Sequence, residues 1–277
     1  VDATFGGGGH SRLILEKMQE GRLYAFDQDK DAIKNAPDDP RFTLIGNNFM
    51  YLHNFLRLHG ALPVDGILAD LGVSSHQIDQ ADRGFSTRFD GPLDMRMDQM
   101  QEKSAWHVVN GYDHGRLSML LRQYGELNQA GRLAGLIIRQ REISAIHTTG
   151  QLMQAISRMA PKGRENKFNA KVFQAIRIEV NNEMEALKEF LEQATKVLRP
   201  GGRIAVISYH SLEDRLVKHY LRSGREDGVI EKDFYGHTLS PLKPLGKPVV
   251  PGHDEMMENP RARSARLRIA EKIIDNG

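Results

Sequence analysis

Short apolar runs bounded by turn residues open the chain and predict β-strands. Two of them, at residues 1–5 and 23–26, flank a run of four glycines and a segment at 11–19 whose apolar residues have helical spacing. This strand–glycine loop–helix–strand unit is typical of parallel sheets. The same patterns predict further strands at 42–45, 66–71, 203–208 and 265–274, and helices at 51–59 and 181–198. We therefore expect an α/β fold with a Rossmann-like, open and mostly parallel sheet.

The alternation of strands and helices stops in the middle of the chain. Between residues 99 and 167 the β-branched runs disappear, and helices are predicted at 104–109, 116–124, 128–143 and 149–159. Since long structureless connections are rare in compact domains, we expect residues 99–167 to form an inserted α-helical subdomain that recognises the substrate. Residues 1–98 and 168–277 would then form one discontinuous domain, with loop-like sequence at 223–260.

Composition narrows the classes of protein to which the chain can belong. Its 277 residues are 40% hydrophobic and 27% charged, as in globular proteins, and no apolar run approaches the roughly 18 residues that span a membrane. The absence of cysteine excludes disulfides, iron–sulfur clusters and a thiolate nucleophile, and it favours a reducing compartment, which we take to be the cytoplasm. The histidines show no metal-ligand spacing, so we expect no metal site. Val1 already lies within an apolar run, so we expect the natural chain to begin before it.

Positive charge gathers in one part of a chain whose net charge is only +2. Residues 1–97 carry 10 basic and 14 acidic side chains, whereas residues 98–167 carry 10 and 6. A basic segment on a nearly neutral protein is a candidate surface for a polyanion such as a nucleic acid. Its members are Arg158, Lys162, Arg164, Lys167 and Lys171. The alternative is an ordinary solvated helix face. A second basic group lies near the C-terminus and consists of Arg261, Arg263, Arg266 and Arg268. The alternative explanation for this group is alternating charge on the exposed face of an edge strand.

The glycine run predicts a loop whose backbone can approach a ligand closely, with helix N–H groups pointing outward. Neither strong phosphate motif is present, because the G-x-G-x-x-G frames end on Ser11 and Arg12 and no Gly-Lys-Ser/Thr follows. Asp27, at the end of the second strand, is placed to accept hydrogen bonds from two ribose hydroxyls; the alternative is a helix N-cap. A ligand with a ribose and a purine but no phosphate, such as S-adenosylmethionine, fits this combination. Phe49 offers a wall for adenine; the alternative is that it belongs to the hydrophobic core. Asp70 ends a predicted strand at the same edge of the sheet.

Several long blocks of the sequence resemble a known bacterial family, the ribosomal RNA small-subunit methyltransferase H (MraW) family. The blocks are DATFGGGGHS at 2–11, DLGVSS at 70–75 with Gln77, RGFS at 83–86, DGPLDMRM at 90–97, FQAIRI at 173–178 with Asn181, SYHSLEDR at 208–215 and NPRARS at 259–264. They follow the family order along nearly the whole chain. Three features depart from the family. Its His-x-Pro-Val block before the first strand is absent, and its His-Pro-Ala-Thr-Arg block reads FNAKV at 168–172. Its first motif usually has a variable residue where this chain has a second or third glycine, a change that should be tolerated.

The resemblance implies methyl transfer from S-adenosylmethionine to the exocyclic N4 of a cytidine in the decoding region of small-subunit (16S) ribosomal RNA. The substrate would be the RNA within an assembled or assembling 30S subunit, and a homodimer is one option for the oligomeric state. The discontinuous domain would then be the S-adenosylmethionine-binding methyltransferase domain. The cofactor contacts that the resemblance implies are Gly8, Gly9, His10, Asp27, Phe49, Asp70 and Gln77.

Methylation of the N4 amine needs a group that accepts a hydrogen bond from it as the nitrogen becomes cationic. The candidates are Asp94, in a loop stiffened by Gly91 and Pro92, and His210, after the fifth strand, which would act either as the acceptor or as a contact to the base. The alternative for His210 is a structural histidine bonded to a carboxylate such as Asp214. Because methylation at cytosine C5 needs a cysteine, transfer to nitrogen or oxygen is the chemistry left open. The alternative functions are methylation of another nucleic-acid nitrogen or oxygen, and a non-enzymatic RNA-binding factor for ribosome assembly.

Overall fold

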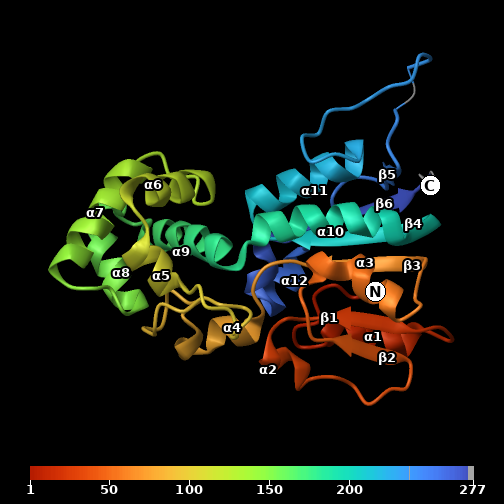
Figure 1. Ribbon diagram of the computed structural model, residues 1–277, viewed down its shortest axis with the longest axis horizontal. Helices are drawn as coiled ribbons and strands as arrows, with labels where there is room; N and C mark the ends of the chain where they lie inside the picture. The colour runs from red at the N-terminus through yellow and green to blue at the C-terminus, as the bar shows by residue number, and fades with distance from the viewer. Residues whose placement is uncertain (237, 274–277) are drawn as a thin grey trace. The chain divides into compact units, whose positions relative to one another are not determined.

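The computed structural model describes residues 1–236 and 238–273, and the chain divides into two compact units. One unit is formed by Val1–Gly72 and Met184–Gly277, and the other by Val73–Glu183. The first contains the β-sheet, and the second consists of helices and irregular segments (Figure 1). No described helix is both long enough and apolar enough to cross a membrane.

The sheet is built from two sets of hydrogen-bonded strands. The strands are β1 (Leu23–Phe26), β2 (Phe42–Ile45), β3 (Val64–Asp70), β4 (Leu198–Ser208), β5 (Leu242–Pro244) and β6 (Arg266–Lys272). The two sets have the orders β1-β2 and β3-β4-β6-β5, and Asp2 joins them through parallel bridges to Ala25 and Leu68. The pairs β1/β2 and β3/β4 are parallel, whereas β6 runs antiparallel to β4 and β5. The predicted α/β class with a mostly parallel sheet is confirmed.

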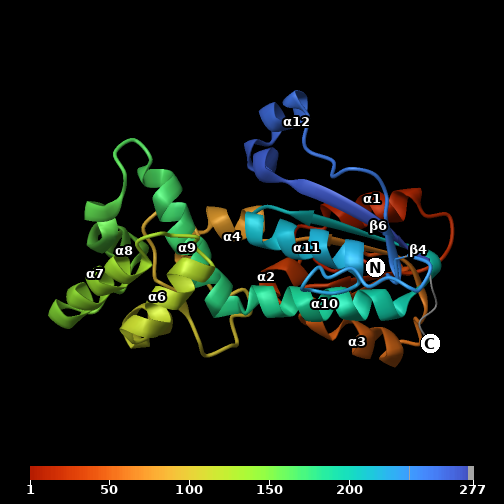
Figure 2. The same cartoon turned by 90° about the horizontal axis from the view of Figure 1, so that it is seen from above.

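Helices cover both faces of this sheet. Figure 2 shows α1 (Gly9–Lys17) on one side, and α3 (Leu52–Leu58) and α10 (Glu183–Val197) on the other. The main core buries side chains of α3, α10 and α11 (Ser211–Ser223) against the strands, and Phe190 of α10 is fully buried there. Burial of a side chain of this size contributes about 1.5–3 kcal/mol. The short helices of this unit are α2 (Lys30–Ile33), η1 (Phe49–Tyr51), α12 (His253–Glu258) and η4 (Pro260–Ser264).

The second unit packs its helices around a core of its own. The helices are α4 (Ser75–Asp79), η2 (Ala81–Arg83), α5 (Ala105–Gly111), α6 (His114–Gln123), α7 (Ala130–Ile143), α8 (Thr149–Ile156), η3 (Ser157–Met159) and α9 (Glu165–Asn181). Fully buried residues such as Val109, Leu121 and Ile137 form this core. The helices predicted between residues 104 and 159 are all present, with small shifts at their ends, whereas α9 was not predicted.

The contact pattern divides the chain at 72/73 and 183/184, rather than at the predicted 98/99 and 167/168. The irregular segment before α5 belongs to the helical unit because Asn181 of α9 holds it. The Asn181 side chain accepts a hydrogen bond from Met97 N and donates one to Met95 O, both at 2.7 Å. Gly91 allows a close approach of the backbone, since a Cβ there would overlap the carbonyl oxygen of Ala81. A role of this unit in substrate recognition stays a prediction.

Further differences concern the strands and the predicted loop. The predicted strand at 1–5 is reduced to a bridge at Asp2, although its backbone hydrogen bonds reach both Tyr24 and Leu68. The predicted loop at 223–260 contains β5 and α12. The predicted strand at 265–274 is β6, and residue 274 lies outside the described residues. Because β6 lies between β4 and β5, the edge-strand explanation of the second basic group is wrong.

Candidate functional site

The glycine run forms the turn that leads into α1. Gly8 is the N-cap of α1, with φ +78° in the left-handed region and no side-chain cap. A Cβ on Gly8 would lie 2.9 Å from Cζ of Phe5, so both the backbone and the space require glycine. A Cβ on Gly7 or Gly9 would meet nothing within 4 Å, so the loop is open on that side. The first N–H groups of α1 can therefore face a ligand.

Buried polar side chains hold the start of this loop. Asp2 is fully buried; its Oδ2 accepts a hydrogen bond from Ser11 Oγ at 2.6 Å, and its Oδ1 accepts one from Thr4 N at 3.2 Å. Thr4 Oγ1 in turn accepts a hydrogen bond from Asp70 N at 2.6 Å. These three side chains were not predicted as part of the site, although they lie within the block at 2–11. Together they fasten the loop to α1 and to the end of β3.

Asp27 follows β1 and bonds to the glycine loop. Its Oδ2 accepts a hydrogen bond from Gly6 N and its Oδ1 accepts one from Asp29 N, both at 2.8 Å. Burial raises the pKa of Asp27 above its ordinary value, although these two N–H groups favour the ionised form. Each carboxylate oxygen keeps lone-pair capacity for a further donor. The N-cap of α2 is Asp29, which accepts a hydrogen bond from Asp31 N, so the alternative assignment of Asp27 as that cap is wrong.

Asp70, the last residue of β3, connects three elements. Its Oδ1 accepts a hydrogen bond from the Tyr209 hydroxyl at 2.9 Å, and its Oδ2 lies 3.3 Å from Nε2 of His10 on α1. The hydrogen bond to Asp70 raises the pKa of His10, and burial together with the Asp70 charge raises the pKa of Tyr209. The pairing of Asp70 with Ile207 brings Tyr209 to this edge of the sheet. Tyr209 was not predicted as a site residue, and the signal available in the sequence was its place directly after the predicted strand at 203–208.

The two remaining predicted cofactor residues have different settings. Phe49 is half-buried at the start of η1, just after β2, and packs edge-on against Phe190 at 5.2 Å between ring centroids. Gln77 belongs to the helical unit, where it is buried on α4 and its Oε1 accepts a hydrogen bond from Ser74 N at 3.0 Å. Phe49 therefore lies just after a strand of the sheet, at the same carboxyl edge as Asp27. Gln77 forms the capping box of α4 together with Ser74.

His210 is the N-cap of α11. Its Nδ1 accepts a hydrogen bond from Glu213 N at 3.3 Å, and Glu213 Oε2 accepts hydrogen bonds from Tyr209 N at 2.9 Å and His210 N at 3.3 Å. Nε2 of His210 lies 3.0 Å from Glu213 Oε1 without the geometry of a hydrogen bond. The expected partner Asp214 is wrong, because Asp214 binds Arg268 at 2.7 and 3.1 Å. His210 thus begins the helix, and Glu213 is the carboxylate beside it.

Asp94 is held by Arg96 within the helical unit. The guanidinium donates to both carboxylate oxygens, from Nε at 2.9 Å and from Nη2 at 2.7 Å. Burial favours the neutral form of Asp94, but the hydrogen bonds and charge of Arg96 outweigh it, so the pKa of Asp94 is lowered. The Asp94 carboxylate is therefore ionised at neutral pH and accepts hydrogen bonds.

The first basic group follows one continuous stretch of the helical unit, from η3 into α9. Its exposed members are Arg158, Lys162, Arg164 and Lys167. Lys171 is half-buried, and its ammonium group donates a hydrogen bond to the carbonyl oxygen of Glu126 at 3.5 Å. Within the described part of the chain, none of the five forms an ion pair with a carboxylate. These charges are thus available to an external anion.

Known proteins resemble this chain along nearly its whole length. A model of the MraW methylase family matches residues 1–273. Ribosomal RNA small subunit methyltransferase H of Cytophaga hutchinsonii is 54% identical over 274 residues, which cover 98% of this chain and 92% of that protein. The protein of the same name from Christiangramia forsetii is 53% identical, over 99% of this chain and 91% of its own length. A solved structure of an rRNA methylase from Streptococcus thermophilus has a TM-score of 0.43 at 11% identity, covering 99% of this chain and 85% of that one.

Proposed function

The chain belongs to the MraW methylase family, and from this premise we propose that it methylates the exocyclic N4 of a cytidine in the decoding region of small-subunit ribosomal RNA, with S-adenosylmethionine as the methyl donor. The observation that carries the proposal is the cluster of an open glycine loop, Asp27 and Asp70 at the carboxyl edge of a parallel sheet. Ligands of α/β proteins bind at this edge. We place the reaction in the cytoplasm, on an assembled or assembling small subunit.

The residues at this edge suit a nucleoside that carries a sulfonium. Asp27 has acceptor capacity for two ribose hydroxyls, and Phe49, which is half-buried just after β2, offers its ring as a wall for adenine. The uncapped N–H groups at the start of α1 suit the carboxylate of the methionine end. Space for this approach exists because Gly7 and Gly9 have no side chain and nothing lies within 4 Å of a Cβ built there. When bound, S-adenosylmethionine supplies an electrophilic methyl group on a positively charged sulfur.

The work left to the protein is to position the amine, since a sulfonium is already a good leaving group. The N4 nitrogen gains a carbon and releases a proton, so an acceptor beside its N–H lowers the barrier. Asp94 is one candidate, because Arg96 keeps it ionised. His210 is the other, as a contact to the base: its Nδ1 accepts the hydrogen bond of the helix cap, so the neutral ring carries its proton on Nε2 and donates from that atom. We propose that one of these two side chains orients the amine.

Two measurements test this function. Purified protein titrated with tritiated S-adenosylmethionine should show saturable binding, and Asp27→Ala should weaken it at least tenfold, because a hydrogen bond to a charged group contributes about 1.5–3 kcal/mol. Asp38→Ala is the matched control, since Asp38 is an exposed carboxylate in the same connection between β1 and β2. Mass mapping of ribosomal RNA from cells that lack the protein should show the loss of one N4-methylcytidine. A complete set of methylated nucleosides in those cells would contradict the proposed substrate.

A further inference from the structure

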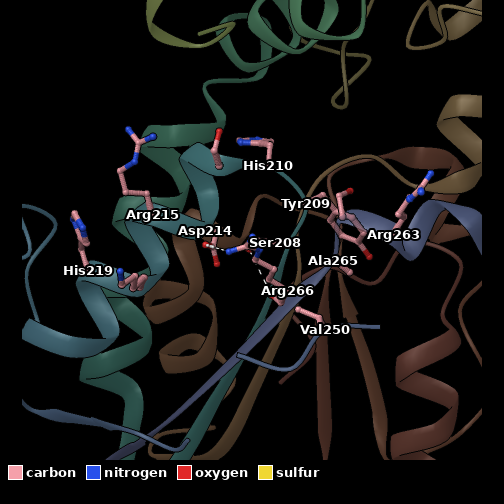
Figure 3. Close-up of a pocket in the computed structure, with 13 residues that line it drawn as sticks. Ser208, Tyr209, His210, Asp214, Arg215, His219, Val250, Arg263, Ala265 and Arg266 are labelled. Carbon is pink, nitrogen blue, oxygen red and sulfur yellow. Dashed lines mark hydrogen bonds and ion pairs between the residues drawn. The ribbon is translucent and has the colours of Figure 1, made fainter. Parts of the chain in front are cut away.

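We propose that a basic pocket in the sheet-containing unit binds a backbone phosphate of the RNA substrate, an inference that rests on the proposed function. The pocket lies between α11 and the segment formed by η4 and the start of β6, and its volume is about 530 Å³. Figure 3 shows side chains of these elements around it. The pocket is distinct from the glycine loop and from the basic group of the helical unit.

Basic side chains dominate the lining of this pocket. Arg215, Lys218 and His219 come from one stretch of α11, Arg263 comes from η4, and Arg266 comes from the first position of β6. The lining also carries hydroxyl groups, from Ser208, Ser211 and Ser264. Arginine, lysine and serine side chains are among the groups that contact nucleic-acid phosphates. The lining therefore matches a phosphate better than a neutral ligand.

The carboxylate that lines the pocket, Asp214, is already neutralised. Arg268 donates to it at 2.7 and 3.1 Å, and Arg266 donates at 3.2 Å. Burial favours the neutral form of Asp214, but the two guanidinium groups outweigh burial and lower its pKa. Lys218 and Arg263 are exposed and form no ion pair within the described residues. The pocket thus carries uncompensated positive charge, which attracts a polyanion.

The position of the pocket makes RNA the expected polyanion. Tyr209 lines the pocket and also donates a hydrogen bond to Asp70, so the pocket borders the candidate cofactor edge. The pairing of Ser208 with Arg266 places the end of β4 and the start of β6 at this same edge. A target base must leave its stack to reach the methyl group, and its nucleotide then brings flanking phosphates to the protein surface. The pocket is placed to hold one of them and so to set the position of the extruded base.

The test compares Lys218→Ala, Arg263→Ala and the double variant with wild type. The control is Lys17→Ala, which removes an exposed lysine on α1 that forms no ion pair within the described residues. Binding of a short, fluorescein-labelled single-stranded RNA is followed by anisotropy across a salt series. Each phosphate contact on a single strand contributes about 0.7 to the slope of log K against log salt, so the double variant should lose about 0.7 and Lys17→Ala should lose nothing. Lys218→Arg, which keeps the charge, should retain the wild-type slope.

The outcomes separate this inference from the function on which it rests. Binding of tritiated S-adenosylmethionine and the urea midpoint of unfolding are measured for every variant, and both should match wild type. If wild type binds cofactor and RNA but the double variant keeps the full slope, the pocket has no phosphate role. An equal loss in Lys17→Ala would also overturn the inference, because the effect would then be one of overall charge. If wild type binds neither ligand, the proposed function fails and the pocket proposal fails with it.

Discussion

Replacement of Gly8 by alanine tests the physical basis of the glycine loop. A left-handed conformation costs a residue with a Cβ about 1–2 kcal/mol, and Gly8 has φ +78°. The new Cβ would also lie 2.9 Å from Cζ and 3.0 Å from Cε2 of Phe5. Phe5 is buried against Phe42 and cannot move away freely, and such overpacking costs about 1–3 kcal/mol. We therefore expect Gly8→Ala to lower the free energy of unfolding by at least about 2 kcal/mol.

Urea denaturation followed by circular dichroism measures this change, with Gly7→Ala as the matched control. Gly7 is not in the left-handed region and a Cβ there meets nothing within 4 Å, so we expect a change within about 0.5 kcal/mol. Titration with tritiated S-adenosylmethionine should show weaker binding for Gly8→Ala than for Gly7→Ala, because a shifted loop moves the first N–H groups of α1. Equal unfolding midpoints for the two variants would refute the reasoning about Gly8.

Three further predictions concern charged groups. Asp70→Asn should lower the pKa of His10 in an NMR titration. The pair stabilises the folded protein fully below the ordinary histidine pKa of about 6.5, and this stabilisation is lost as pH rises through the raised pKa of His10. A His10 titration that is unchanged in Asp70→Asn would contradict the assigned hydrogen bond. Asp94→Asn should bind cofactor and RNA but turn over on the order of 10²-fold more slowly; full turnover would remove Asp94 from the role. Neutralising Arg158, Lys162 and Arg164 together should flatten the salt dependence of RNA binding by about 2 in slope, and an unchanged slope would indicate a merely solvated face.

The local sequence was sufficient for the parts of the fold that depend on local patterns. β1 and β2 have the predicted bounds, because short apolar runs between turn residues leave little freedom in their assignment. The location of Asp27 and Asp70 at the sheet edge could be predicted from their places at the ends of predicted strands, since the carboxyl ends of parallel strands meet at one edge. Their roles toward a cofactor stay predictions.

The parts that the sequence did not predict depend on contacts between distant residues. Tyr209 reaches Asp70 only because β4 pairs with β3, and no local pattern contains that pairing. The choice of Glu213 rather than Asp214 beside His210 follows from the geometry of a helix N-cap, which favours the third residue after the cap. The first boundary of the helical unit was placed too late in the sequence. The irregular segment before α5 has no periodicity that would show which unit it belongs to, and only its hydrogen bonds to Asn181 show this.

The buried hydrogen bonds of Asp2 have a consequence for the entropy of ligand binding. They hold both ends of the glycine loop in place when the protein folds, before any ligand arrives. A ligand that binds there does not have to immobilise a mobile segment, which would otherwise subtract from its affinity. A substitution at Asp2 should therefore weaken binding through the disorder it introduces into the free protein, although its side chain is fully buried and is itself out of reach of a ligand.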